Sequence, residues 1–246
     1  MEEVDHVLEN IKFVKERIRK SCEKAGRDPK EVKLLLATKT VTSERIIEAL
    51  KDGNTLIGEN KIQEVKEKYE DLKSVPHTMH FIGHLQTNKI KEILKYNVNL
   101  VESVDRMELA EKLDQRLKFE KRELDVFIQV NTSAEESKFG VAPELAIDLV
   151  KQVATLSSLH IKGLMTIGLF SAETEKVRKC FQLLKRIQEE VKQLQLPNVE
   201  MNELSMGMSG DMETAIEEGA TIIRVGTAVF GKRIYPDSYY WNEEKK

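Results

Sequence analysis

Lys39 is the residue whose type and position first suggest chemistry. It follows the apolar run from Leu34 to Ala37 and the hydroxyl residue Thr38, a pattern that indicates a buried strand. Partial desolvation at the end of such a strand favours the neutral amine, which is a nucleophile toward carbonyl groups. The competing interpretation is a lysine just past the strand that extends its charge into water.

Two glycine-rich stretches near the C-terminal end predict an anion site. Residues 205–212 read SMGMSGDM and residues 224–231 read RVGTAVFG, and each follows an apolar or β-branched run. Gly226 lets the backbone approach an anion closely, and the hydroxyl groups of Ser205 and Thr227 can donate to phosphate oxygens. A capped helix start, with Ser205 or Ser209 as the cap, or a plain strand-to-helix turn also fits these stretches. Combined with a reactive lysine, they indicate an aldehyde that bears a phosphate, either pyridoxal 5'-phosphate or a sugar phosphate.

The elements that would position these residues alternate regularly along the chain. Apolar or β-branched runs predict strands at 32–38, 55–57, 79–82, 100–101, 124–130, 161–165, 200–204 and 221–225. Helical patterns lie between them at 43–51, 60–72, 87–95, 106–117, 143–156, 174–194 and 211–218, and a further amphipathic helix is expected at 4–22.

About eight such units in 246 residues predict an α/β fold, a single (β/α)8 TIM-type barrel with an extra N-terminal helix. An open doubly wound sheet would also alternate, but with less even spacing. Without a linker rich in Pro, Gly or Ser, residues 1–246 are expected to form one domain. In a barrel the strand ends share one mouth, and the loops after strands seven and eight commonly bind phosphate. Lys39 and the two glycine-rich stretches should therefore meet there.

Eight stretches of the chain resemble the pyridoxal phosphate homeostasis protein family. They are LLLATKT at 34–40, GENKIQE at 58–64, MHFIGHLQTNK at 79–89, ESVDR at 102–106, IQVNTSAEESKFG at 128–140, IKGLMTI at 161–167, LSMGMSGDMETAIEEGAT at 204–221 and IRVGTAVFGKR at 223–233. The resemblance implies a barrel like the N-terminal domain of alanine racemase. It also implies that the cofactor, pyridoxal 5'-phosphate, is held as a Schiff base on Lys39.

The same resemblance implies roles for the other site residues. The phosphate would be held by Ser205, Gly226 and Thr227, the pyridine nitrogen would face Arg224, and the ring would lie near Asn60 and His80. Two positions depart from the family pattern, because Met79 stands where an aromatic residue is expected and His84 where a proline is expected. Both departures concern the ring-side wall and leave the lysine and the phosphate loops unaffected.

Arg224 limits the chemistry of such a site. A guanidinium group stays charged and only donates hydrogen bonds, so a pyridine nitrogen beside it remains unprotonated. The ring is then a poor electron sink, and transamination is not expected. Apart from the resemblance, a strand-end arginine in a salt bridge explains Arg224 equally well.

Composition excludes several other classes of function. The chain has 39 Lys and Arg against 42 Asp and Glu, a formal charge of -3, which indicates neither a nucleic-acid nor a membrane partner. Cys22 and Cys180 lie far apart and outside any CxxC, so neither a disulfide framework nor a zinc site is expected. His77, His80 and His84 lack the spacing of metal ligands on a strand. Without a targeting segment or an apolar run of about 20 residues, a soluble cytoplasmic protein is expected.

Three functions remain open from the sequence. The first is storage and delivery of pyridoxal phosphate without robust catalysis, by a monomer that meets acceptor apoenzymes transiently. After Arg233 only thirteen residues remain, too few for the β-domain of alanine racemases. The second is a racemase or related proton-transfer enzyme, with Lys39 as one base and His80, Tyr235 or Tyr239 as the other. The third is a class I aldolase that acts on a sugar phosphate.

Overall fold

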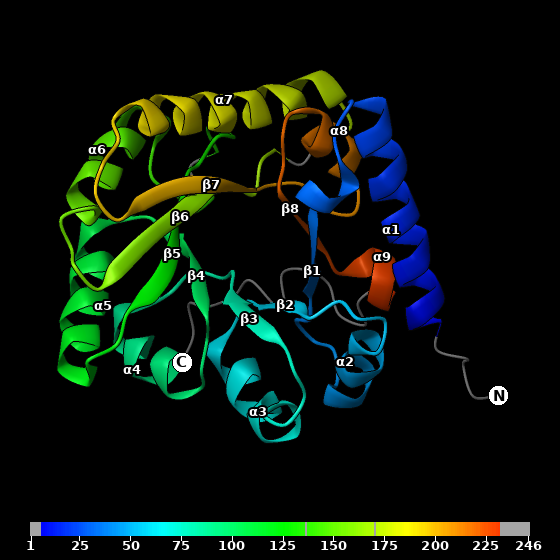
Figure 1. The fold of residues 1–246 in the computed structure, drawn as a ribbon, viewed down its shortest axis with the longest axis horizontal. Helices are drawn as coiled ribbons and strands as arrows, with labels where there is room; N and C mark the ends of the chain where they lie inside the picture. Colours follow the sequence, from blue (N-terminus) through cyan, green and yellow to red (C-terminus); the bar gives the residue numbers. More distant parts are fainter. Residues whose placement is uncertain (1–5, 136, 170, 232–246) are drawn as a thin grey trace.

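The structure is a computed structural model that describes residues 6–135, 137–169 and 171–231. Eight parallel strands close into one barrel in which each strand pairs with its neighbours in chain order and β8 pairs with β1 (Figure 1). Their bounds are β1 Lys33–Ala37, β2 Leu56–Glu59, β3 Thr78–Phe81, β4 Leu100–Val104, β5 Leu124–Gln129, β6 Leu159–Met165, β7 Val199–Ser205 and β8 Ile222–Val225. The predicted barrel is confirmed.

Helices connect consecutive strands and cover the outside of the barrel (Figure 1). They are α1 Val7–Lys24, α2 Ser43–Leu50, α3 Ile62–Leu72, α4 Ile90–Lys95, α5 Met107–Glu120, α6 Pro143–Val153, α7 Thr174–Gln193, α8 Met212–Glu217 and α9 Thr227–Phe230, with 3-10 turns η1 Pro29–Glu31 and η2 Thr87–Lys89. The helix expected at 87–95 thus begins as the 3-10 turn η2. Helix α9 was not predicted, because four residues are too few to display a helical period.

Two apolar layers result from the alternation of side chains along each strand. The larger layer lies between the barrel and its helices. A small inner cluster fills the barrel and consists of Leu35, Leu100, Phe127, Met165 and Ile222. Because Leu35 points inward, the same alternation directs the side chains of Leu34 and Leu36 outward.

The predicted N-terminal helix is α1, and it packs on the barrel's own helices. Its apolar stripe, which includes Val7, Ile11, Val14 and Ile18, is buried. The helix lies against α2, α8 and α9, along one side of the barrel (Figure 1). None of the helices within the described ranges combines the length and apolar character that a membrane crossing requires.

Candidate cofactor site

Lys39 lies in a tight turn directly after β1, at the C-terminal end of the barrel. The Val41 N–H donates to the Thr38 carbonyl oxygen at 3.0 Å and closes this turn. Lys39 itself is half-buried. Alternation along the strand assigns it to the same side as Leu35 and Ala37, which pack in or against the inner cluster. The lysine therefore lies at the predicted mouth, two residues past the end of β1.

The barrel interior contains a continuous chain of buried polar side chains. His80 Nδ1 lies 2.7 Å from Glu102 Oε1, and the Ser205 hydroxyl donates to Glu102 Oε2 at 2.6 Å. Arg224 Nη1 donates to Ser205 Oγ at 2.7 Å, and its Nη2 donates to the Thr166 carbonyl oxygen at 2.7 Å. A fully buried carboxylate thus lies within one network with a histidine and a guanidinium group, which compensates its charge.

Arg224 is held rigidly inside this network. The residue is 5% exposed. Burial lowers its pKa from the ordinary value, and the carboxylates of Glu102 and Asp211 act in the opposite direction. An arginine stays charged in proteins, so Arg224 presents a fixed, donor-only cation to the interior.

The two serines near the end of β7, Ser205 and Ser209, lie in different surroundings. Ser205 is 0% exposed, and its hydroxyl is engaged with Glu102 and Arg224 inside the barrel. The hydroxyl that accompanies Thr227 belongs to Ser209 instead. Thr227 Oγ1 donates to Ser209 Oγ at 3.3 Å, and the Ala228 N–H donates to the same oxygen at 3.4 Å. Sequence reasoning had treated Ser209 only as a possible helix cap.

Close backbone approaches shape the loops that bear these hydroxyl groups. An ideal Cβ on Gly226 would lie 3.2 Å from the Ala37 carbonyl oxygen, so the chain after β8 runs tightly beside the end of β1. Gly207 has a φ of 91°, and a Cβ there would lie 2.4 Å from that of Ala215. The loop after β7 is also tied to β8, because the Arg224 N–H donates to the Gly207 carbonyl oxygen at 3.0 Å.

Loops after β2, β3 and β5 form the remaining rim. Asn60 directly follows β2, and its carbonyl oxygen would lie only 1.9 Å from a Cβ on Gly83. His84 stacks on Phe139, with ring centroids 3.9 Å apart and planes inclined by 16°. The unusual residue at position 84 therefore joins the loop after β3 to the loop after β5.

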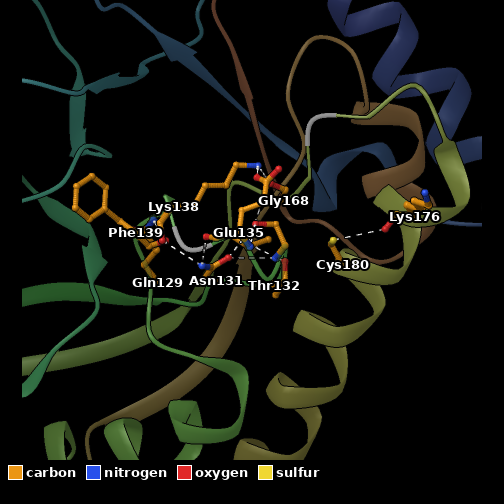
Figure 2. A network of polar contacts seen from close by, with 11 residues as sticks. Gln129, Asn131, Thr132, Glu135, Lys138, Phe139, Gly168, Lys176 and Cys180 are labelled. Carbon is orange, nitrogen blue, oxygen red and sulfur yellow. Dashed lines mark hydrogen bonds and ion pairs between the residues drawn. The ribbon is translucent and has the colours of Figure 1, made fainter. Parts of the chain in front are cut away.

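The loop after β5 is held by its own polar contacts (Figure 2). Asn131 Nδ2 donates to the carbonyl oxygens of Glu135 and Lys138 at 2.9 and 3.1 Å. Gln129 Nε2 donates to the Phe139 carbonyl oxygen at 3.1 Å, and Lys138 Nζ reaches the Gly168 carbonyl oxygen at 2.7 Å. These contacts link the loops after β5 and β6.

A separate cavity of about 790 Å³ opens at the opposite, N-terminal end of the barrel. Its walls include Lys33, Leu56, Thr78 and Phe127, and it extends inward as far as His80. Neither Lys39 nor Thr227 lines it. The cationic groups Lys33 and Lys162 on its wall already pair with Glu203 and Glu200. This cavity is thus distinct from the donor groups at the C-terminal mouth.

The three histidines His77, His80 and His84 contact different partners. His77 Nδ1 contacts the Val75 carbonyl oxygen at 2.7 Å, while His80 and His84 contact Glu102 and Phe139. In the described part of the chain, no group of three His, Cys, Asp or Glu side chains lies close enough together to hold a metal ion.

The donor set at the mouth fits an aldehyde that bears a phosphate. Register between β1 and β8 pairs Leu35 with Arg224, so the segment that ends in Lys39 runs beside the segment that ends in Thr227. An amine, two hydroxyl groups and the backbone around Gly226 therefore come from adjacent elements. The buried cation Arg224 lies on the inner side of the same strand end. The amine suits the aldehyde of pyridoxal phosphate, and the hydroxyl and backbone groups suit its phosphate.

Comparison with known proteins shows the family to which the chain belongs. Residues 5–234 match the family model described as alanine racemase, N-terminal domain. The pyridoxal phosphate homeostasis protein of Aquifex aeolicus is 44% identical over 230 residues, which cover 94% of this chain and 100% of the relative. The protein of the same name from Homo sapiens is 36% identical over 237 residues, covering 92% of this chain and 86% of the relative.

Solved structures show the same fold. PipY of Synechococcus elongatus, solved with PLP bound, superposes with a TM-score of 0.76 at 31% identity and covers 87% of this chain and 100% of its own. An alanine racemase of Clostridium difficile reaches a TM-score of 0.72 at 13% identity, with 95% of this chain and 58% of its own covered, and so shares the barrel fold. The chain belongs to the pyridoxal phosphate homeostasis protein family, whose barrel it shares with the N-terminal domain of alanine racemases.

Proposed function

We propose that this protein binds pyridoxal 5'-phosphate on Lys39 and serves cofactor homeostasis by storing and delivering it, without robust catalysis. The observation that supports this most is that Lys39 and Thr227 follow the paired strands β1 and β8, and that the Thr227 hydroxyl lies 3.3 Å from that of Ser209. The family of the chain points in the same direction.

Covalent attachment would occur at the Lys39 amine. Pyridoxal phosphate supplies an aldehyde, to whose carbon the amine nitrogen forms a double bond while one water molecule is released. The hydroxyl groups of Ser209 and Thr227, with the backbone N–H group of Thr227, would donate to the phosphate. Ser209 takes the role that the sequence had suggested for Ser205.

The proposed limit on catalysis follows from the surroundings of Arg224. Its contacts with Ser205 and Thr166 hold the guanidinium group in one place. Beside the ring nitrogen, this guanidinium group would donate a hydrogen bond and could not accept one. The nitrogen would then stay unprotonated, and the ring would be a poor electron sink. Asn60 would lie on the ring side, as the resemblance implies. His80 would act through Glu102 and the network instead of contacting the ring.

Racemisation would need a second base at the site. His80 is 6% exposed and already engaged with Glu102. Tyr235 and Tyr239, the other predicted candidates, lie outside the described residues. No described contact therefore favours the racemase alternative, and the storage function is the better supported of the two.

Mixing experiments test the storage function against catalysis. Loaded protein, freed of unbound cofactor, should restore activity to an apoenzyme that depends on pyridoxal phosphate, while it racemises alanine no faster than the free cofactor does. The Lys39→Ala variant, treated identically, should restore much less activity. Turnover of alanine well above that of the free cofactor would make the protein an enzyme, and failure to load any apoenzyme would contradict delivery.

A further inference from the structure

The turn that bears Lys39 contains an unfavourable backbone conformation. Thr40, the next residue, has a φ of 64°, a left-handed value that is rare for a β-branched residue. With the Thr38 to Val41 hydrogen bond, this positive φ corresponds to the third position of a type II turn, where glycine is preferred. Such a conformation persists only where the surrounding structure imposes it.

Two side chains of helix α3 form hydrogen bonds with the backbone on both sides of Lys39. Glu64 Oε2 accepts the Thr40 N–H at 2.6 Å. Lys68 Nζ donates to the Thr38 carbonyl oxygen at 2.8 Å and to Glu64 Oε2 at 2.9 Å. Glu64 and Lys68 are four residues apart and share one face of the helix. The peptide groups before and after Lys39 are thus fixed from outside the barrel wall.

Glu59 anchors this pair from strand β2. Its Oε1 accepts from Lys68 Nζ at 2.7 Å and from the Thr38 hydroxyl at 2.6 Å. Glu59 and Thr38 are 0% exposed and Lys68 is 7% exposed. Burial raises the pKa of the Glu59 carboxyl to about 7, and the ammonium group of Lys68 opposes that shift. A buried ion pair is a poor source of stability, so its presence against the Lys39 turn suggests a positional role.

We propose that Glu64 and Lys68 are positioning residues for the cofactor lysine, which hold the Thr38 to Thr40 backbone so that the Lys39 side chain faces the barrel interior. This inference rests on the proposed attachment of pyridoxal phosphate to Lys39. It gives a structural meaning to the GENKIQE stretch at 58–64, whose first glutamate is Glu59 and whose last is Glu64. Neither Glu64 nor Lys68 needs to touch the cofactor.

The decisive experiment removes the hydrogen bond from Glu64 and then replaces Thr40, whose φ is unfavourable, by glycine. We expect Glu64→Ala to raise the dissociation constant for pyridoxal phosphate by about 10- to 100-fold, the size of one lost hydrogen bond to a charged group. Adding Thr40→Gly should restore affinity to within about threefold of the wild type, because glycine adopts a positive φ without assistance. Lys68→Met should also weaken binding.

Controls separate positioning from folding. Glu108→Ala and Lys112→Met disrupt an exposed pair on α5 with the same four-residue spacing and should leave affinity unchanged. Glu64→Gln keeps an oxygen acceptor for the Thr40 N–H and should bind within about threefold of the wild type. Thermal unfolding of each variant shows whether it is folded at the assay temperature.

The outcomes distinguish this inference from the function on which it rests. If the wild type attaches no cofactor, the proposed function is wrong. If it does attach cofactor and Glu64→Ala behaves like Glu108→Ala, or Thr40→Gly gives no rescue, only the positioning role is wrong. Should Glu64→Ala fail to fold, amide hydrogen exchange in the wild type decides. Slow exchange of the Thr40 N–H supports its hydrogen bond to Glu64, and exchange as fast as in an open loop overturns the positioning role.

Discussion

At the scale of single residues, the site depends on which of two serines meets the phosphate. Ser205 ends β7, and the alternation of side chains directs it into the barrel, where it bridges Glu102 and Arg224. Ser209 lies four residues later, in a loop braced by the bond from the Met208 N–H to Asp211 at 2.6 Å. In a barrel the functional groups lie at the C-terminal ends of the strands, and this rule alone predicts that Lys39, Gly226 and Thr227 lie at the mouth. The choice between the serines required the fold of that loop.

Replacing each serine tests this distinction. Ser209→Ala should weaken binding of pyridoxal phosphate by about 10- to 100-fold, since it removes a donor to a charged group. It should change binding of pyridoxal, which lacks the phosphate, by less than about threefold. Ser205→Ala should lower the melting temperature, because Glu102 and Arg224 lose their bridge, and should not discriminate between the two ligands. A phosphate-selective loss in Ser205→Ala, without one in Ser209→Ala, would reverse the assignment.

At the scale of elements, helix α1 braces the part of the barrel that holds the anion loops. Asn10 Nδ2 donates to the Val229 carbonyl oxygen at 3.0 Å, which ties α1 to α9. Arg17 Nη2 donates to the Ser209 carbonyl oxygen at 3.1 Å, and its Nε donates to Glu213 of α8 at 2.7 Å. The apolar period predicted this helix, yet periodicity cannot tell which surface an amphipathic helix covers. Its neighbours became known only from the structure.

Two arginines on α1 offer a matched comparison. Arg17→Ala should loosen the loop that presents Ser209 and weaken binding of pyridoxal phosphate by about 3- to 10-fold. Arg19→Ala removes an arginine that pairs only with Glu16 and Glu23 of its own helix, as far as the described residues show, and should leave binding unchanged. Isothermal titration of the apoproteins measures both. Equal affinities for the two variants would contradict a bracing role for α1.

At the scale of the whole molecule, the sequence predicted the barrel because its eight alternations are evenly spaced. The predicted bounds of the strands and helices agree with the structure to within a few residues, except that the 3-10 turns η1 and η2 and the helix α9 were not predicted. The cluster of Thr38, Glu59 and Lys68 could not be predicted, because its members come from the turn after β1, from β2 and from α3, which only the closed fold brings together. The same holds for the stacking of His84 on Phe139. The predicted monomeric state and cytoplasmic location stay predictions.

The buried Glu59 makes global stability depend on pH. Its folded pKa of about 7 exceeds the ordinary 4.5, so the folded state binds the proton more tightly than the unfolded state does. This contribution is present below about pH 4.5 and is lost as pH rises through 7, a change of up to about 3 kcal/mol. Glu59→Gln should remove it. Urea unfolding of the wild-type and Glu59→Gln apoproteins measures their free energies of unfolding from pH 4 to 8. A difference between the two that does not change with pH would contradict this prediction.

The central claim is that pyridoxal phosphate attaches to the amine of Lys39, and one measurement tests it most directly. Purified protein, loaded with the cofactor, is reduced with borohydride, digested and mapped by mass spectrometry. The account predicts a phosphopyridoxyl group on the peptide that contains Lys39, and none on that peptide in Lys39→Ala. An unmodified Lys39 peptide, with the cofactor recovered on another lysine or only free in solution, would contradict it.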